Sequence, residues 1–282
     1  MRIDAHLHFW KPSCGFDNRP IADHAAYRRD FMPADVMNEL DACGIDGVIL
    51  VQTCPQTEET DWIVDLASRE QRVWGVTAWV NLDGPPCDFA SLARRPKVVG
   101  IRAQLRRVAD ASFVARPAVV ANLSHALQTG LNVTVLAEAR HYDYLAAVLD
   151  ALPPGPVTIN HLALPFADVD RRKWQAALRN FVRRPEVYLQ FSGVPFLFGE
   201  RWRDSLSVLD EAFAIFGPER LLFASDWPML LRFATYDDWV GAVQDFLSAR
   251  HVSDAAIEAV FAGNARRANP LLQLPAKFLE TS

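Results

Sequence analysis

The chain reads Arg2-Ile3-Asp4-Ala5-His6-Leu7-His8-Phe9-Trp10 near its amino end, a short run in which apolar and polar side chains alternate. Side chains two apart on a β-strand lie on the same face. His6 and His8 are therefore expected to point the same way, close enough to hold one cation between them. A strand that ends in His-x-His directs attention to further ligands downstream.

Similar runs recur along the chain, and segments with helical spacing lie between most of them. The expected strands are residues 2–8, 47–52, 74–81, 98–104, 131–138, 157–162, 187–192 and 221–226. Helices are expected over 33–43, 60–69 and 236–249, and Thr235 suits the N-cap of the last. Eight buried strands alternating with helices predict an α/β fold, a (β/α)8 TIM barrel spanning 1–282 as one domain. The alternative, a doubly wound sheet, usually carries a G-x-G-x-x-G loop after its first strand, and this chain has none there.

The amino-acid composition limits the kinds of molecule that the protein is expected to bind. The chain has 282 residues, 50% of them hydrophobic, and a formal net charge of −5. This balance argues against nucleic acid and membrane surfaces as partners. The cysteines show no disulfide or zinc-ribbon spacing, and we expect neither a leader peptide nor a spanning segment. The sequence predicts a cytoplasmic enzyme acting on a small molecule; it is compatible with a homo-oligomer without indicating one.

Polar side chains close the expected strands, and a barrel places its chemistry at that end. The strand-end residues are Gln52, Asn81, Arg102, Gln104, Glu138, Asn160, His161, Gln190, Ser192, Ser225 and Asp226. His6, His8, His161 and Asp226 together form a set of three nitrogens and one oxygen that suits Zn²⁺ or Mn²⁺. Each residue also has a structural interpretation. Asp226 could cap a helix starting at Pro228, Arg102 could form an ordinary ion pair, and Glu138 fits a structural or rim position better than a catalytic one.

Several stretches resemble the amidohydrolase superfamily, in particular its branch of L-fuconolactonases and pyrone-dicarboxylate lactonases. They are residues 3–10, 28–33, 44–52 with 59–60, 98–102, 160–162, 216–228 and 263–267, which together cover essentially the whole chain. The resemblance implies a (β/α)8 barrel whose mouth site uses His6, His8, His161 and Asp226. It also implies that Arg102, which follows Val-Gly-Ile, contacts substrate oxygens.

The chain departs from this family at three places. Many members bridge two metals through a lysine or glutamate and a further histidine, but 133–138 contain no histidine. We therefore expect one divalent cation, zinc or manganese, and leave metal-free catalysis open. Fuconolactonase-like members typically read Asp-His-x-Gly-Lys-Pro and Lys-x-Ser-Gly, where this chain has Asn160-His161-Leu162-Ala163-Leu164-Pro165 and Gln190-Phe191-Ser192-Gly193. These changes affect the expected substrate more than the reaction class.

The resulting hypothesis is hydrolysis of a sugar-acid lactone, such as L-fuconolactone, to the open-chain acid. Asp226 is the expected general base, and His161 is a ligand or an oxyanion donor. The expected substrate contacts are Arg102, Gln52 and Asn160, with Trp10 and Trp227 as an apolar wall and loop 11–31 shaping specificity. The roles of Glu138 and Gln190 stay open. The alternatives are a metal-dependent decarboxylase of the same superfamily and a barrel that binds sugar acids without turnover.

Overall fold

A computed structural model describes residues 1–16, 27–166 and 168–278, and its centre is one parallel β-sheet. Each strand pairs with the next in chain order. The strands are β1 (Ile3–Leu7), β2 (Gly47–Val51), β3 (Val73–Trp79), β4 (Val98–Gln104), β5 (Asn132–Leu136), β6 (Val157–Ile159), β7 (Val187–Phe191) and β8 (Leu221–Phe223). All eight are buried throughout, apart from the last residue of β3, as parallel strands covered by helices on the outside require.

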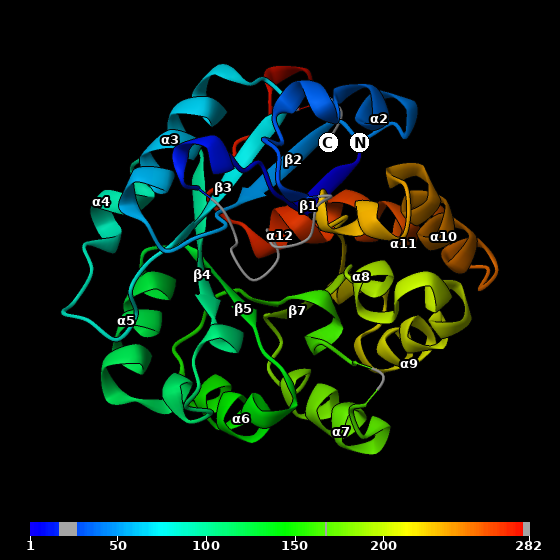
Figure 1. Ribbon diagram of the computed structural model, residues 1–282. Helices are drawn as coiled ribbons and strands as arrows, with labels where there is room; N and C mark the ends of the chain where they lie inside the picture. The colour runs from blue at the N-terminus through cyan, green and yellow to red at the C-terminus, as the bar shows by residue number, and fades with distance from the viewer. Residues whose placement is uncertain (17–26, 167, 279–282) are drawn as a thin grey trace.

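Helices surround the strands (Figure 1). They are α2 (Met37–Ala42), α3 (Thr57–Arg69), α4 (Phe89–Ala93), α5 (Pro117–Gln128), α6 (Tyr142–Ala151), α7 (Arg171–Phe181), α8 (Val194–Phe198), α9 (Ser207–Phe216), α10 (Tyr236–Ser248), α11 (Asp254–Glu258) and α12 (Asn264–Ala268). The (β/α)8 barrel predicted from the alternating pattern is confirmed. The helix predicted over 33–43 divides at Val36 into a 3₁₀ turn, Pro33–Asp35, and α2.

The α10 helix follows its sequence signals closely. Thr235 Oγ1 accepts a hydrogen bond from the Asp238 amide at 3.1 Å, and the Asp238 carboxylate accepts one from the Thr235 amide at 2.9 Å. This reciprocal capping box satisfies two amides that a helix start leaves unpaired. The buried face of α10, including Trp239 and Val243, then packs into the core.

The seam between β8 and β1 closes the barrel at the point where both strands end. The Asp226 amide donates to the His6 carbonyl at 2.9 Å, and the His8 amide donates to the Trp227 carbonyl at 2.7 Å. Leu7 and Trp227 form a parallel bridge there. Closure of the barrel therefore brings the first and last strand-end segments side by side, although more than 200 residues separate them in the chain.

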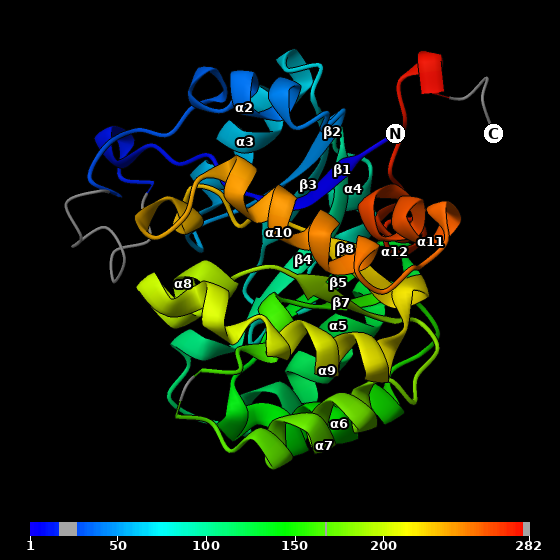
Figure 2. The same cartoon turned by 90° about the vertical axis from the view of Figure 1, so that its right-hand side faces the viewer.

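The opposite end of the barrel is covered by the carboxyl-terminal helices. Figure 2 shows α11 and α12 at that end and α8 at the other. The Asn132 side-chain amide donates to the Ala268 carbonyl at 2.6 Å, and alanines of α12 join an apolar cluster with Ile3 and Trp74. A broad hollow of about 860 Å³ lies there, beside Arg266 and Arg267. None of the polar strand-end residues lines it, so the chemistry is to be sought at the other end.

Two surface features bear on partners. Within the described part of the chain, no helix has both the length and the apolar character that crossing a membrane requires. Tyr144 is the large hydrophobic side chain that is exposed in those same residues.

Candidate active site

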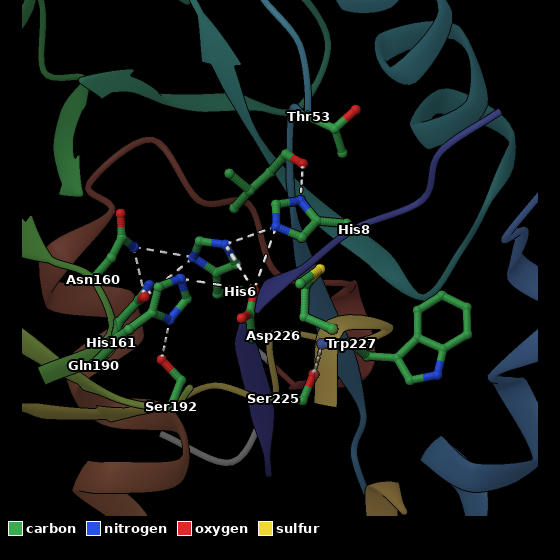
Figure 3. Close-up of polar contacts among 12 residues, drawn as sticks. His6, His8, Thr53, Asn160, His161, Gln190, Ser192, Ser225, Asp226 and Trp227 are labelled. Atoms are coloured by element: carbon green, nitrogen blue, oxygen red, sulfur yellow. Dashed lines mark hydrogen bonds and ion pairs between the residues drawn. The ribbon is translucent and has the colours of Figure 1, made fainter. Parts of the chain in front are cut away.

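His6 and His8 lie on one face of the first strand-end segment, as the alternation predicted, and their rings meet edge to face (Figure 3). Their Nε2 atoms are 3.2 Å apart. His8 Nδ1 lies 2.5 Å from the Val51 carbonyl, which can only accept, so Nδ1 carries the proton and Nε2 presents a lone pair. His8 is thereby held in the tautomer that a metal ligand needs.

His6 is held by an amide pair from two other strand ends. Gln190 Oε1 and Asn160 Nδ2 each lie 3.1 Å from His6 Nδ1, and the two amides are 2.6 Å apart. The ring can accept from Asn160 or donate to Gln190, and donation leaves the Nε2 lone pair free beside that of His8. Burial, with the charges of His161 and His8, lowers the pKa of His6 well below its usual value, so the ring is neutral near pH 7.

Asp226 faces both rings from the segment that follows β8. Its Oδ1 lies 3.7 Å from His6 Nε2 and 3.5 Å from His8 Nε2, and its backbone has φ 59°. Burial alone would raise the pKa of this carboxyl, but His161, His8 and Arg102 together hold the pKa below its usual range. The side chain does not cap the turn that follows, whose N-cap is Pro228 without a side-chain cap bond. Asp226 is thus an ionised carboxylate aimed at the histidines.

His161 begins a strained turn after β6. The four consecutive residues 161–164 all have φ between 48° and 60°, a left-handed conformation that costs roughly 1–2 kcal/mol per non-glycine residue. Two buried side chains support it, because Trp174 Nε1 donates to the Leu162 carbonyl at 2.7 Å and Tyr142 donates to the Ala163 carbonyl at 2.6 Å. Gly193 lies against His161, where an added Cβ would come within 2.9 Å of the His161 Cβ. The surroundings therefore fix the backbone of His161.

The ring of His161 contacts both Ser192 and Asp226. Its Nδ1 lies 2.7 Å from Ser192 Oγ, and its Nε2 lies 3.7 Å from Asp226 Oδ1. Burial is the main reason that the pKa of His161 falls to about 4, so this ring is also neutral near pH 7. If Ser192 accepts the Nδ1 proton, Nε2 can bind a metal; if Ser192 donates, Nε2–H can donate to a substrate oxygen. Both predicted roles thus use the same ring position.

The donor set fits a divalent cation. One ligand atom from each of His6, His8 and Asp226 lies within 4.8 Å of the others. Tetrahedral zinc with bonds of about 2.0–2.1 Å requires ligand atoms about 3.3–3.4 Å apart, close to the 3.2, 3.5 and 3.7 Å separations found. His161 lies outside this tight group, although its Nε2 faces the same carboxylate oxygen. Two imidazoles and a carboxylate leave a coordination position open for substrate or water.

A cavity of about 550 Å³ opens onto these groups. Its polar lining consists of the site residues His8, His161 and Asp226, together with Arg102, Gln104, Arg106 and Arg107. The apolar lining consists of Leu136, Leu164, Phe196 and Met229. Its location at the carboxyl ends of the strands is where barrel enzymes act.

Of the residues predicted to contact the substrate, Arg102 lines the cavity, whereas the side chains of Gln52 and Asn160 do not. Arg102 lines the cavity and donates from Nη1 to the Gln52 carbonyl at 2.8 Å. The Gln52 side chain is fully buried, with bonds to Thr60, the Trp79 amide and two carbonyls. Gln52 therefore acts through its backbone on Arg102. Asn160, also fully buried, contacts His6 and not the cavity.

Trp10 and Trp227 do not form the apolar wall expected of them, in so far as the described residues define the cavity. Trp227 is fully buried and packs edge to face on Phe9 and Phe31. Trp10 packs on Phe31 and donates to the Arg29 carbonyl at 3.2 Å. Both rings lie behind the site because closing the seam between β1 and β8 needs apolar bulk there. Of loop 11–31, residues 17–26 lie outside the described residues.

Sequence reasoning missed several residues that shape the site. Asp4 Oδ1 accepts from the amides of His6 and Ser225 at 3.1 and 3.0 Å, and its Oδ2 accepts from Tyr236 at 2.8 Å. It ties together the two backbones that carry His6 and Asp226. In the sequence, the position of Asp4 two residues before His6, on the same strand face, could have indicated that Asp4 belongs to the site. Arg106 and Arg107 follow β4 in a 3₁₀ turn, where no periodicity indicates their direction.

Glu138, whose role was left open, lies at the rim. It pairs with Arg140 Nε at 2.6 Å and with Arg106 Nε at 3.5 Å. Gln190 takes the position beside His6 described above. Glu138 therefore forms ion pairs at the rim of the site, and Gln190 orients His6.

Comparison with known proteins shows the family to which the chain belongs. The amidohydrolase family model matches residues 3–271. The L-fucono-1,5-lactonase of Burkholderia ambifaria is 33% identical over 94% of this chain and 93% of its own, and that of Burkholderia multivorans is 30% identical over 95% of each. A crystal structure of a Burkholderia multivorans amidohydrolase with bound zinc is 28% identical, with a TM-score of 0.85 over 95% of this chain and 98% of its own. The chain belongs to the amidohydrolase family.

Proposed function

We propose that this enzyme hydrolyses the ring ester of a sugar-acid lactone to the open-chain hydroxy acid. The observation that carries the proposal is the convergence of Asp226 Oδ1 with Nε2 of His6, His8 and His161, at 3.5–3.7 Å, beside the cavity. The full-length similarity to two L-fucono-1,5-lactonases supports a lactone as the substrate.

Asp226 acts as the general base. The carboxylate takes a proton from a water molecule, whose oxygen attacks the lactone carbonyl carbon and forms a tetrahedral oxyanion. The oxyanion then collapses, the bond between that carbon and the ring oxygen breaks, and Asp226 returns its proton to the departing alkoxide. The lowered pKa of Asp226 keeps the base ionised at neutral pH.

The histidines and Arg102 prepare the substrate for attack. When the Ser192 hydroxyl donates to His161 Nδ1, the ring carries its own proton on Nε2. This Nε2–H then donates to the developing oxyanion. His6, His8 and Asp226 would hold a zinc or manganese ion, with His161 as a further ligand in its other tautomer. When bound, such an ion supplies Lewis-acid polarisation of the carbonyl. Arg102, fixed through the Gln52 carbonyl, orients substrate oxygens.

A direct assay tests the reaction class. Purified enzyme, with and without added zinc or manganese, is offered L-fucono-, L-galactono- and L-rhamnono-lactones in a pH-stat, while evolved carbon dioxide is measured in the same vessel. Release of acid without carbon dioxide supports hydrolysis. In a parallel vessel that holds an unsaturated carboxylic acid in place of the lactone, release of carbon dioxide would instead identify a decarboxylase. Lactone binding measured by calorimetry, without turnover in any metal state, would identify a barrel that binds sugar acids without catalysis.

A further inference from the structure

The cavity is unusually rich in hydrogen-bond donors. Three of the eleven residues that line it are arginines, each with five N–H donors and no acceptor. The side-chain acceptors on the polar lining are the Asp226 carboxylate and the ring nitrogens of His8 and His161, which the reaction uses, and Gln104 Oε1. A polyhydroxylated neutral ring needs acceptors for its hydroxyl protons, and this wall offers few of them. An acceptor-only group matches it better.

Arg102 is the cavity residue whose surroundings point most clearly to a ligand with hydrogen-bond acceptors. Its side chain is only 3% exposed, and Nε has no hydrogen-bond partner among the described residues. Nη1 reaches the neutral Gln52 carbonyl at 2.8 Å. A buried guanidinium with an open donor loses hydration without replacement, which is costly unless a ligand supplies the missing acceptor. Gln104, 8% exposed and two residues along the same strand face, also has an unpartnered atom, Oε1.

A second positive charge lies close to Arg102. The guanidinium carbons of Arg102 and Arg107 are 5.5 and 5.2 Å from the centroid of the same ring, that of Trp79. Like charges gathered at one cavity wall repel each other, and burial already lowers the pKa of Arg102 to about 10. An anion bound in the cavity near both groups would offset this repulsion.

We propose that the substrate lactone carries a carboxylate, which binds at Arg102 and Arg107 while the ring ester faces Asp226. A planar carboxylate matches the donor fork of a guanidinium, and four apolar side chains complete the cavity around the ring. This inference rests on the proposed lactonase function and narrows its substrate class to acidic lactones, for example the monolactone of a sugar diacid. The neutral L-fuconolactone named for the relatives lacks that group.

Matched substrates test the charge alone. L-gulono-1,4-lactone and D-glucaro-6,3-lactone share ring and configuration and differ in a terminal CH₂OH or carboxylate. We expect kcat/KM to be at least 10-fold higher for the acidic lactone at low salt. The advantage should shrink in 0.5 M NaCl as the charges are screened. Arg107→Gln should reduce the acidic-to-neutral ratio at least fivefold, whereas Arg69→Gln, an exposed arginine paired with Asp65 outside the cavity, should leave the ratio unchanged.

A binding measurement keeps the two hypotheses separable. Calorimetry of the open-chain glucarate dianion against the gulonate monoanion needs no turnover. Tighter binding of glucarate, weakened in Arg107→Gln, supports the acidic subsite even if no lactone is hydrolysed, in which case the lactonase proposal alone fails. Equal binding of the two acids, or faster hydrolysis of the neutral lactone, overturns the acidic subsite and leaves the lactonase proposal standing.

Discussion

The Asp226 amide donates to the His6 carbonyl at 2.9 Å, while the Asp226 carboxylate lies 3.7 Å from His6 Nε2. The hydrogen bond that closes the barrel thus joins the same two residues whose side chains meet in the site. Any change that opens the seam between β1 and β8 will separate the base from its neighbouring ring. Stability and activity are therefore coupled at this end of the barrel more tightly than at the end covered by α12.

Removal of metal should abolish activity and lower stability together. Dialysis against a chelator is expected to reduce kcat at least 100-fold and to lower the Tm, because an ion bound only by the folded state stabilises it. Readdition of zinc or manganese should restore both. The measurement pairs metal analysis with the pH-stat rate. Full activity in protein whose zinc and manganese content is undetectable would instead indicate the metal-free mechanism that the sequence left open.

Gln190→Leu should weaken metal binding without disturbing the fold. The substitution removes the acceptor that holds His6 Nδ1–H, and loss of such an outer partner typically lowers metal affinity 10–100-fold. Gln190→Glu, which keeps an acceptor at that position, is the matched control and should bind metal more tightly than the leucine variant. Equal zinc Kd values for all three proteins would refute this role for Gln190.

Asp4 should make stability depend on pH in the acidic range. Burial raises the pKa of this carboxyl from 3.8 to about 6, so between these values the folded state keeps a proton that the unfolded state has released. The contribution of Asp4 therefore falls as pH rises from 4 to 6 and is constant above that, a loss of roughly 3 kcal/mol.

Asp4→Asn lacks this titration and provides the comparison. Urea unfolding at pH 4 and pH 7 should show the wild type more stable relative to the variant at pH 4. If the difference in unfolding free energy between the two proteins is the same at both pH values, Asp4 does not titrate in this window.

In the turn formed by residues 161–164, replacing alanine with glycine should not lower stability, in contrast to the same replacement in a helix. Ala163 has φ 60°, a conformation that glycine adopts without strain, so Ala163→Gly should be neutral or stabilising. Ala146→Gly, within the helix α6, should cost about 1 kcal/mol because glycine is a poor helix former. Chemical denaturation of both variants makes the comparison. A loss at Ala163 as large as that at Ala146 would mean that the left-handed turn is not strained.

Much of the fold was predictable because its signals are local. Strands buried on both faces give apolar runs, and the capping box at Thr235 marks the start of α10. His6, His8, His161 and Asp226 could be collected because barrel strands all end at one edge. Strand ends were predicted too long, as in 157–162 against Val157–Ile159, because the last residues leave the sheet to turn toward the site.

Other features could not be predicted because they depend on packing between distant segments. Trp10 and Trp227 look like a sugar-stacking pair in sequence, yet seam closure turns both inward onto Phe31. The Gln52 side chain accepts hydrogen bonds from Thr60 in α3 and from the Trp79 amide in β3, and these form only once both elements are in place. Arg102 could be predicted from its strand, but Arg106 and Arg107 come from a 3₁₀ turn with no sequence periodicity. The full positive charge of the substrate pocket therefore becomes visible only in three dimensions.

The most direct test of the account is the rate of Asp226→Asn on its best lactone, with zinc content and Tm measured on the same sample. The neutral amide cannot take the proton from water, so we predict at least a 100-fold loss of kcat in a protein that still folds. Hydrolysis at the native rate by a folded Asp226→Asn enzyme would contradict the assignment of Asp226 as the base.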